Sequence, residues 1–404
     1  MSDGMPIYLD YNATTPIDPR VLDAMMPFLT SAYGNPASKS HAFGWQAEAA
    51  VETAREQLAD LIGASTREIV WTAGATESNN LALRGAAEMY RDRGQHIITC
   101  RTEHRAVLDP CQHLAEAGWL LTVLDVDPTG RLDPQQVADA ITDQTVLVSV
   151  MAANNEVGTL HPIAEIGAVC KARGVLLHCD ATQAVGKVPI DVQTMGIDLL
   201  SASGHKIYGP KGVGCLYVRR RDPRVRLCCQ IHGGQHERGL RSGTLNVPGI
   251  VGFGQAAAIC REEMPDEAVR LAKLRDRLHH GILDGLDDVY LNGHPTERLP
   301  NTLNLSFAYV EGEALMMRLR ALAVSSGSAC TSESREPSHV LTAMGVDETR
   351  INSSLRITLG RYTTAEEIDR AVDEIVRGVT QLRELSPLYE LARKTQGHAA
   401  SRET

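Results

Sequence analysis

The chain has 404 residues, of which 43% are hydrophobic and 22% charged, an ordinary composition for a globular protein large enough to form two domains. Its 40 basic and 50 acidic residues give a net charge of −10, which argues against general affinity for nucleic acid or an anionic membrane surface. No apolar run approaches the roughly 18 residues that a membrane-spanning helix needs. The first residues do not resemble a secretory signal, so we expect a cytoplasmic protein.

The chain contains nine cysteines, an odd number with irregular spacing and no CxxC pair. This pattern favours free thiols in a cytosolic protein, most of them small core residues. The cysteines are Cys100, Cys111, Cys170, Cys179, Cys215, Cys228, Cys229, Cys260 and Cys330.

From about residue 65 to 220, short β-rich runs alternate with helical patterns. Strands are expected at 68–72, 96–100, 120–124, 145–151, 175–179, 199–201 and 214–218, and helices at 77–93, 106–117, 134–140 and 163–173. This alternation predicts an α/β fold with a mostly parallel seven-stranded central sheet and helices on both faces. Ligands in such sheets bind at the carboxyl ends of the strands.

After about residue 262 the pattern changes to a mixture of charged helices and single strands. Helices are expected at 267–286, 312–322 and 365–385, and strands at 302–307 and 354–358. We read this as a smaller α+β domain. The expected division is a large domain of residues 16–262, with residues 1–15 and 263–404 forming the small domain.

The strongest local signal is the hexapeptide from Ser201 to Lys206, in which a strand ends in small and hydroxyl residues. A lysine held at a strand end can lose its proton and form a Schiff base. Ser203 and His205 could donate hydrogen bonds to a phosphate. A surface lysine after a strand is the simpler alternative.

Two further segments point to the same chemistry. Asp180 ends the apolar run 175–179, and a pyridoxal cofactor needs a carboxylate against its ring nitrogen. In the segment around Ala75 and Thr76, a strand passes through glycine into a helix, whose free N–H groups bind phosphate. Alternatively, Asp180 is a capping or turn residue and Thr76 merely caps its helix.

Other candidates are weaker when each is taken alone. His104 could stack on a cofactor ring, although an isolated histidine is more often structural. Asn155 and Gln183 could each bind a cofactor oxygen or a substrate carboxylate. Thr244 lies in a turn rich in phosphate donors, and Arg356 needs an anion partner, either a substrate or a structural carboxylate.

Cys330 lies in a Ser/Gly-rich stretch with little bulk around it, so its thiol is expected to be exposed and able to act as a nucleophile. An incidental cysteine in a flexible loop is the alternative.

Two other groups of residues allow different readings. Cys228, Cys229, His232 and His236 have a spacing that could hold zinc, but no second ligand cluster follows. The basic run 219–226 is expected to be a solvated loop, or else a docking patch for an acidic partner. It lacks the interleaved aromatic residues of a nucleic-acid site.

Taken together, the segments resemble the cysteine desulfurases of iron–sulfur cluster assembly, and the housekeeping type more than the nitrogen-fixation type. The resemblance runs from about residue 6 to 389, with the motifs in the order of the family, and is far more specific than any single motif. The matching segments are YLDYNATTP, GNPAS, GATESNN, TEH, NNEVG, DATQ, SGHKIYGPKG, HERGLRSGT and SSGSACTS.

This resemblance implies a fold-type I homodimer of the class V aminotransferase group that carries pyridoxal 5'-phosphate. Lys206 would bind the cofactor as a Schiff base, Asp180 would pair with its ring nitrogen, Gln183 would contact its ring hydroxyl, and His104 would stack on its ring. Asn155 and Arg356 would bind the carboxylate of L-cysteine. The phosphate would be held by Ala75, Thr76, Ser203 and His205, with Thr244 from the other subunit.

The resemblance also implies the reaction. Lys206 would remove the Cα proton of L-cysteine, and Cys330 would attack the substrate sulfur, leaving alanine and a Cys330 persulfide. The persulfide would pass to an iron–sulfur scaffold and to carriers for tRNA thiolation and thiamin, and Cys330 could transiently share a [2Fe–2S] cluster with the scaffold. The alternatives are a related pyridoxal enzyme, such as a selenocysteine lyase or an aminotransferase, and a docking platform without catalysis.

Overall fold

The computed structural model describes residues 5–326 and 337–400, the side chains of 394–400 excepted. Cys330 lies outside the described residues, so the expectations that concern it remain predictions. Within the described part, no helix combines the length and apolar character needed to cross a membrane.

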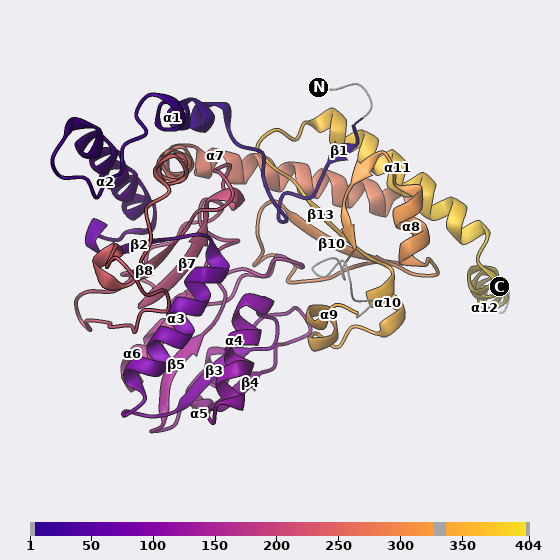
Figure 1. The fold of residues 1–404 in the computed structure, drawn as a ribbon. Coiled ribbons are helices and arrows are strands. Elements are labelled where there is room, and N and C mark those ends of the chain that lie inside the picture. The colour runs from indigo at the N-terminus through magenta and orange to yellow at the C-terminus, as the bar shows by residue number, and fades with distance from the viewer. Residues whose placement is uncertain (1–4, 327–336, 401–404) are drawn as a thin grey trace.

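A seven-stranded sheet forms the centre of the larger part of the molecule (Figure 1). Neighbouring strands of this sheet run parallel to one another, except that β8 runs antiparallel to the strands on both sides of it. This confirms the predicted mostly parallel α/β sheet. In spatial order the strands are β2 (Ile69–Thr72), β8 (Gly214–Val218), β7 (Leu199–Ser203), β6 (Leu176–Asp180), β5 (Thr145–Ser149), β3 (His96–Cys100) and β4 (Leu120–Leu124).

Successive residues of the central strands are buried on opposite faces of this sheet, as strand geometry requires. Ile98, Val148 and Leu177 enter one apolar core, and their neighbours Ile97 and Leu147 enter another. Helices α3 (Ala75–Tyr90) and α4 (Arg105–Glu116) cover the second core. The first core is covered by α1 (Pro19–Thr30), α2 (Ala42–Ile62), α5 (Pro134–Ala140), α6 (Ile163–Arg173) and α7 (Val247–Gly285).

A second, antiparallel sheet lies in the C-terminal part, beside a separate apolar core that includes Leu305, Phe307 and Ile357. Its strands, in spatial order, are β12 (Ser325–Ser326), β13 (Ser354–Thr358), β10 (Thr302–Phe307) and β9 (Val289–Leu291). The remaining elements of this part are α8 (Gly312–Arg318), α9 (His339–Ala343), α10 (Glu348–Asn352), α11 (Ala365–Glu384) and α12 (Pro387–Ala400).

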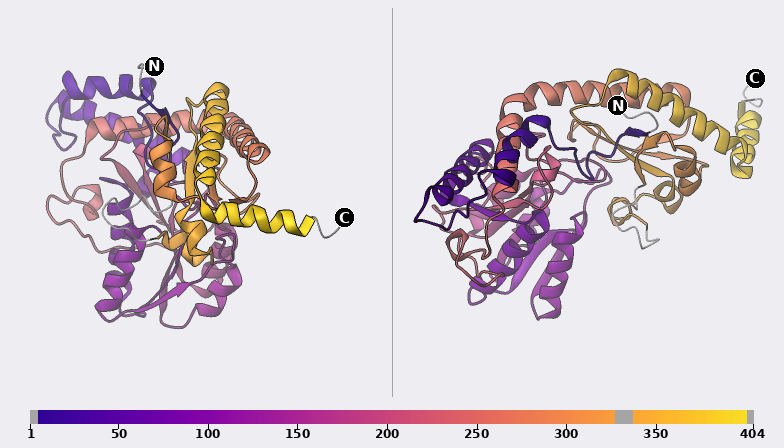
Figure 2. Two further views of the ribbon diagram at one scale, coloured as in Figure 1. Left: turned by 90° about the vertical axis from the view of Figure 1, so that its right-hand side faces the viewer. Right: turned by 45° about the horizontal axis from the view of Figure 1, so that its top comes forward.

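The N-terminal segment joins the second part before the chain enters the first. Strand β1 (Ile7–Tyr8) pairs in parallel with β11 (Leu322–Ala323), and Asp10 forms an isolated bridge with Thr358. Figure 2 shows the indigo segment that contains β1 beside the orange and yellow elements of the C-terminal part. The chain then crosses to α1, passing the interface between the two parts.

Helix α7 differs most from its prediction. We expected a helix over 267–286, but it begins at Val247, where Asn246 caps it by accepting a hydrogen bond from Gly249 N, and it links both parts of the molecule (Figure 1). The predicted domain boundary at residue 262 therefore falls inside one continuous helix. The division into two domains stays a prediction.

The early start of α7 was concealed by the glycines of its first turns, which have low helix propensity. One of them, Gly254, allows close contact with α2, because a Cβ there would lie only 2.5 Å from the Cα of Ala54. Tight packing between α2 and α7 thus selects a residue that the helix itself disfavours.

We predict that Gly254→Ala destabilises the protein, because the added methyl group meets backbone that cannot rotate away. The expected loss in the free energy of unfolding is about 1–3 kcal/mol, measured by urea denaturation. Val269→Ala is a matched control on the same helix, since Val269 is 56% exposed, and should change stability by less than about 0.5 kcal/mol. A Gly254→Ala protein as stable as the control would contradict the packing argument.

Candidate active site

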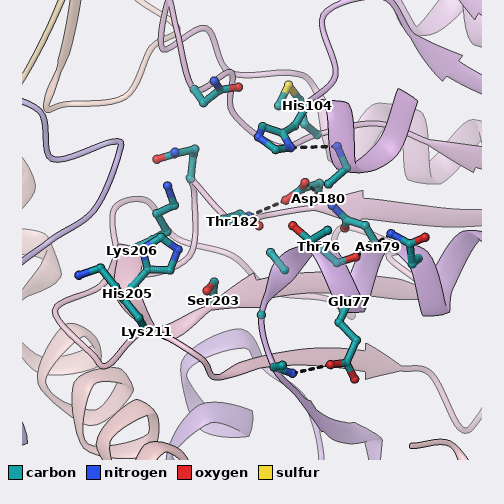
Figure 3. Close-up of a pocket in the computed structure, with 18 of the residues that line it drawn as sticks. Thr76, Glu77, Asn79, His104, Asp180, Thr182, Ser203, His205, Lys206 and Lys211 are labelled. Atoms are coloured by element: carbon teal, nitrogen blue, oxygen red, sulfur yellow. Dashed lines mark hydrogen bonds between the residues drawn. The ribbon is translucent and has the colours of Figure 1, made fainter. Parts of the chain in front are cut away.

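A cavity of about 740 Å³ opens at the carboxyl ends of the central strands, beside the N-terminus of α3. Figure 3 shows His104, Asp180, Ser203 and Lys206 arranged around this one space. Of the predicted site residues, those that line it are Ala75, Thr76, His104, Asn155, Asp180, Gln183, Ser203, His205 and Lys206.

Asp180 is the last residue of β6, and its carboxylate is buried and fixed through both oxygens. Oδ2 accepts a hydrogen bond from Asn79 Nδ2 at 2.7 Å, and Oδ1 accepts one from Thr182 N at 3.0 Å. Asn79 belongs to α3, so this helix orients the carboxylate while its N-terminus faces the same cavity. The sequence analysis overlooked Asn79, although it lies within the quoted segment GATESNN.

Lys206 lies three residues after β7, and β7 pairs with β6, the strand that carries Asp180. Lys206 therefore reaches the cavity from the strand next to that of Asp180. Its Nζ donates hydrogen bonds to the backbone oxygens of Asn12 at 2.6 Å and Ala13 at 2.8 Å. An amine held by two carbonyl oxygens has a defined direction, and both carbonyls come from the N-terminal segment.

The turn before α3 provides backbone N–H groups at the cavity edge. Glu77 stabilises this turn by accepting a hydrogen bond from Ala73 N at 2.9 Å, and it also forms an ion pair with Arg241 at 2.8 Å. The turn lies close to β8, because a Cβ on Gly214 would be 2.6 Å from the backbone of Gly74. A helix start of this kind binds anions, and phosphate in particular.

Two histidines at the site are held in their neutral forms. Burial, together with the charge of the nearby Lys206, lowers the pKa of His205 to about 4. Burial also lowers the pKa of His104, which caps α4 by accepting a hydrogen bond from Ala106 N on Nδ1 at 3.0 Å. With Nδ1 as the acceptor, a neutral His104 carries its proton on Nε2.

Behind the cavity, Glu103 is fully buried and accepts a hydrogen bond from Met151 N through Oε1. Its Oε2 has no hydrogen-bond partner within the described structure. Burial and the charge of Asp180 raise the pKa of Glu103 well above its usual value. The charged form of Glu103 is therefore disfavoured at this buried position beside Asp180.

Arg356 and Thr244 do not line the cavity. Arg356, on β13, forms an ion pair with Asp10 at 2.8 Å and donates to the backbone oxygen of Asn155 at 3.2 Å. The anion partner expected from the sequence is thus a structural carboxylate in this structure, next to a residue of the cavity. Thr244 is exposed, so its predicted contact with a second subunit stays a prediction.

The alternative of a zinc site is not supported, because no group of three or more potential ligands occurs anywhere in the part of the chain that the structure describes. The basic run 219–226 is only partly the solvated loop that we expected. Arg219 directly follows β8, where it is buried and forms an ion pair with Asp198 at 3.0 Å.

Comparisons of the chain with known proteins point to one family. The class V aminotransferase family matches residues 7–371. A protein of Anaeromyxobacter sp. (strain Fw109-5) named cysteine desulfurase IscS is 59% identical over 390 residues, covering 96% of each chain. The chain belongs to the cysteine desulfurases of the class V aminotransferase family.

Solved structures agree with this assignment. A NifS-like protein has a TM-score of 0.87 and 39% identity, covering 93% of this chain and 100% of that one. A structure titled SspA in complex with cysteine has a TM-score of 0.79 and 38% identity, covering 89% of this chain and 100% of that one. The predicted cysteine desulfurase family and its fold class are confirmed.

A row of buried side chains supports the strand that carries Asp180 in this desulfurase. His178, on β6, hydrogen bonds to Ser149 Oγ at 2.8 Å and to Ser201 Oγ at 3.1 Å, bridging β5 and β7. Burial lowers the pKa of His178 from 6.5 to about 4. The unfolded chain therefore takes up a proton here at pH values where the folded chain does not.

We predict that the free energy of unfolding falls as pH drops from about 6.5 towards 4, with His178 contributing up to about 3 kcal/mol of the loss. The His178→Gln protein should show a correspondingly weaker pH dependence in urea denaturation. His113→Gln is the matched control, because His113 is exposed, and it should behave as wild type. Equal pH dependence in all three proteins would refute this role for His178.

Proposed function

We propose that the protein is a pyridoxal-phosphate-dependent cysteine desulfurase that takes sulfur from L-cysteine and releases L-alanine. The observation that carries this proposal is the convergence of Asp180 and Lys206 on one cavity beside the N-terminus of α3. The relatives named cysteine desulfurase, and the similar protein solved with cysteine, support the same substrate.

The residues around the cavity fit the cofactor that the family implies. Lys206 would hold pyridoxal phosphate as a Schiff base, Asp180 would face its ring nitrogen, and Gln183 would contact its ring hydroxyl. His104 would stack on its ring. The bound cofactor supplies an electron sink for the charge left when the Cα proton is removed.

The cofactor phosphate would lie at the start of α3. Ala75 and Thr76 would donate backbone and hydroxyl groups, and Ser203 would add its hydroxyl. His205 would contribute a ring N–H, since a neutral imidazole still has one donor. In the homodimer that we propose, Thr244 of the second subunit would complete the phosphate site.

Lys206 would move the Cα proton of the substrate. Its Nζ is directed by the carbonyl oxygens of Asn12 and Ala13, which would hold the amine at the site to act as a base. His104, neutral at physiological pH because of burial, can give or accept a proton when the products leave.

Asn155 and Arg356 would bind the substrate carboxylate. Asn155 lines the cavity, and its backbone oxygen already contacts Arg356. The Arg356 Nε is buried and makes no hydrogen bond within the described residues. A buried, unsatisfied guanidinium donor is costly, and a carboxylate would satisfy it.

The sulfur would be transferred to Cys330. The Cys330 thiolate would attack the substrate sulfur, forming an S–S bond as the carbon–sulfur bond breaks, so that cysteine and a thiol become alanine and a persulfide. The persulfide would pass to an iron–sulfur scaffold or to sulfur carriers for tRNA thiolation and thiamin. A transient [2Fe–2S] cluster shared between Cys330 and the scaffold, and a cytoplasmic location, belong to the same proposal.

We predict that purified protein given L-cysteine and a reductant forms alanine and sulfide in equal amounts. Lys206→Ala should abolish both products, because the amine is lost, and Cys330→Ser should abolish them because the sulfur has no acceptor. Lys171→Ala and Cys229→Ser are matched controls, an exposed lysine on α6 and a partly exposed thiol, and should retain activity.

The activities of these variants distinguish the desulfurase from the alternative enzymes. A Cys330→Ser protein as active as wild type would refute the persulfide step and favour a lyase. Wild-type protein with bound cofactor but no alanine would refute the desulfurase proposal, and turnover of other amino acids would then indicate an aminotransferase.

We further predict that Arg356→Lys raises the KM for L-cysteine by about tenfold to a hundredfold, because one charged, bidentate hydrogen-bond donor is lost. The absorbance of the bound cofactor should stay unchanged. Arg277→Lys, which alters an exposed ion pair with Asp369, is the matched control. An unchanged KM in Arg356→Lys would show that Arg356 only holds Asp10.

A further inference from the structure

Lys187 lies next to the active site but belongs to none of the predicted groups. It lies four residues after Gln183 in a series of turns, and its Nζ donates hydrogen bonds to Gln183 Oε1 at 2.7 Å and to Asn12 Oδ1 at 3.1 Å. It does not line the main cavity. It does line a small void of about 20 Å³ on the other side, which Lys206 also borders.

The contact between Lys187 and Gln183 decides which way the Gln183 amide points. The protonated amine of Lys187 has only donors, so the amide oxygen of Gln183 faces it. The Gln183 Nε2 then points to the opposite side, where it donates to the backbone oxygen of Asn12 at 2.9 Å. Because Gln183 lines the cavity, the second N–H of Nε2 is the donor that it offers there.

The same lysine acts on Lys206 through one residue. The Asn12 side chain accepts from Lys187, while the Asn12 backbone oxygen accepts from both Gln183 and Lys206. Lys187 is thus two hydrogen bonds away from the Schiff-base lysine. The four side chains form one connected network at the wall of the cavity.

The position is electrostatically unfavourable for a lysine. Burial and the charges of Lys206 and Arg356 lower the pKa of Lys187 to about 7, although Cys260 and Glu267 act in the opposite direction. An amine placed among other cations costs stability, and replacing a buried charge by an apolar side chain of similar volume is often neutral or stabilising. A residue kept at such a cost is characteristic of a functional site.

We propose that Lys187 is a positioning residue, which fixes the Gln183 amide with its N–H directed at the bound cofactor. This inference rests on the proposed function only in taking pyridoxal phosphate as the occupant of the cavity. Lys187 would not touch the cofactor, and its effect would pass entirely through Gln183.

The test compares holoenzymes carrying Lys187→Met, Lys187→Arg, Gln183→Leu and the Lys187→Met/Gln183→Leu pair. Lys171→Met, at an exposed lysine of α6, is the matched control. The readouts are the absorbance maximum of the bound cofactor, kcat/KM for L-cysteine, and the urea midpoint of unfolding.

We expect Lys187→Met to shift the absorbance maximum in the same direction as Gln183→Leu and to lower kcat/KM about tenfold, with an unchanged or higher unfolding midpoint. In the double variant, Lys187→Met should add less than about a twofold further loss, because its effect passes through Gln183. Lys187→Arg should keep the wild-type absorbance, since a guanidinium also only donates.

The inference is overturned if Lys187→Met keeps the wild-type absorbance and loses only stability, or if the two losses multiply in the double variant. These results are separate from a failure of the proposed function. Wild-type protein that binds the cofactor but forms no alanine would refute the desulfurase activity, while the absorbance comparison would still test Lys187.

Discussion

The geometry of the active site depends on one buried side chain, Asn12, that connects the two parts of the molecule. Its Nδ2 donates to Asn155 O and to Thr302 Oγ1, and its N–H donates to Thr358 Oγ1. Its backbone oxygen accepts hydrogen bonds from Gln183 and Lys206, and its Oδ1 accepts from Lys187 and Asn301. A buried polar group so fully satisfied holds a unique arrangement, because each lost partner leaves another group unpaired in a low dielectric.

This constraint explains why the N-terminal segment pairs with the second part of the molecule before entering the first. Asn12 can reach Thr302 and Thr358 only because β1 lies along β11 and Asp10 lies beside Thr358. Its backbone oxygen then faces Lys206, at the end of a strand in the other sheet. The amine of Lys206 is therefore oriented by a segment that the C-terminal sheet holds in place.

Much of the central sheet could be predicted from the sequence, because each strand is a short apolar run followed by a polar or small residue. The same pattern placed Asp180 and Lys206 at strand ends, which is why they could be found. Helix α7 was misplaced because its glycines serve packing against α2, a tertiary contact without local signal. Asn12 and Lys187 were missed because a buried polar network is visible only once distant segments have met. Arg219 was misjudged because it begins a run of charged residues of which most are exposed.

The positive charges clustered at the site favour the binding of an anionic ligand. Lys187, Lys206 and Arg356 lie close enough for their charges to oppose one another, and Asp10 is the carboxylate that pairs with Arg356. Burial raises the pKa of Glu103 and so disfavours a second negative charge beside Asp180. A phosphate and a substrate carboxylate would offset this repulsion, and a ligand that binds only the folded state also stabilises it. The repulsion among these cations would thus be relieved by the groups that we propose the site binds, so that ligand binding and stability would be linked.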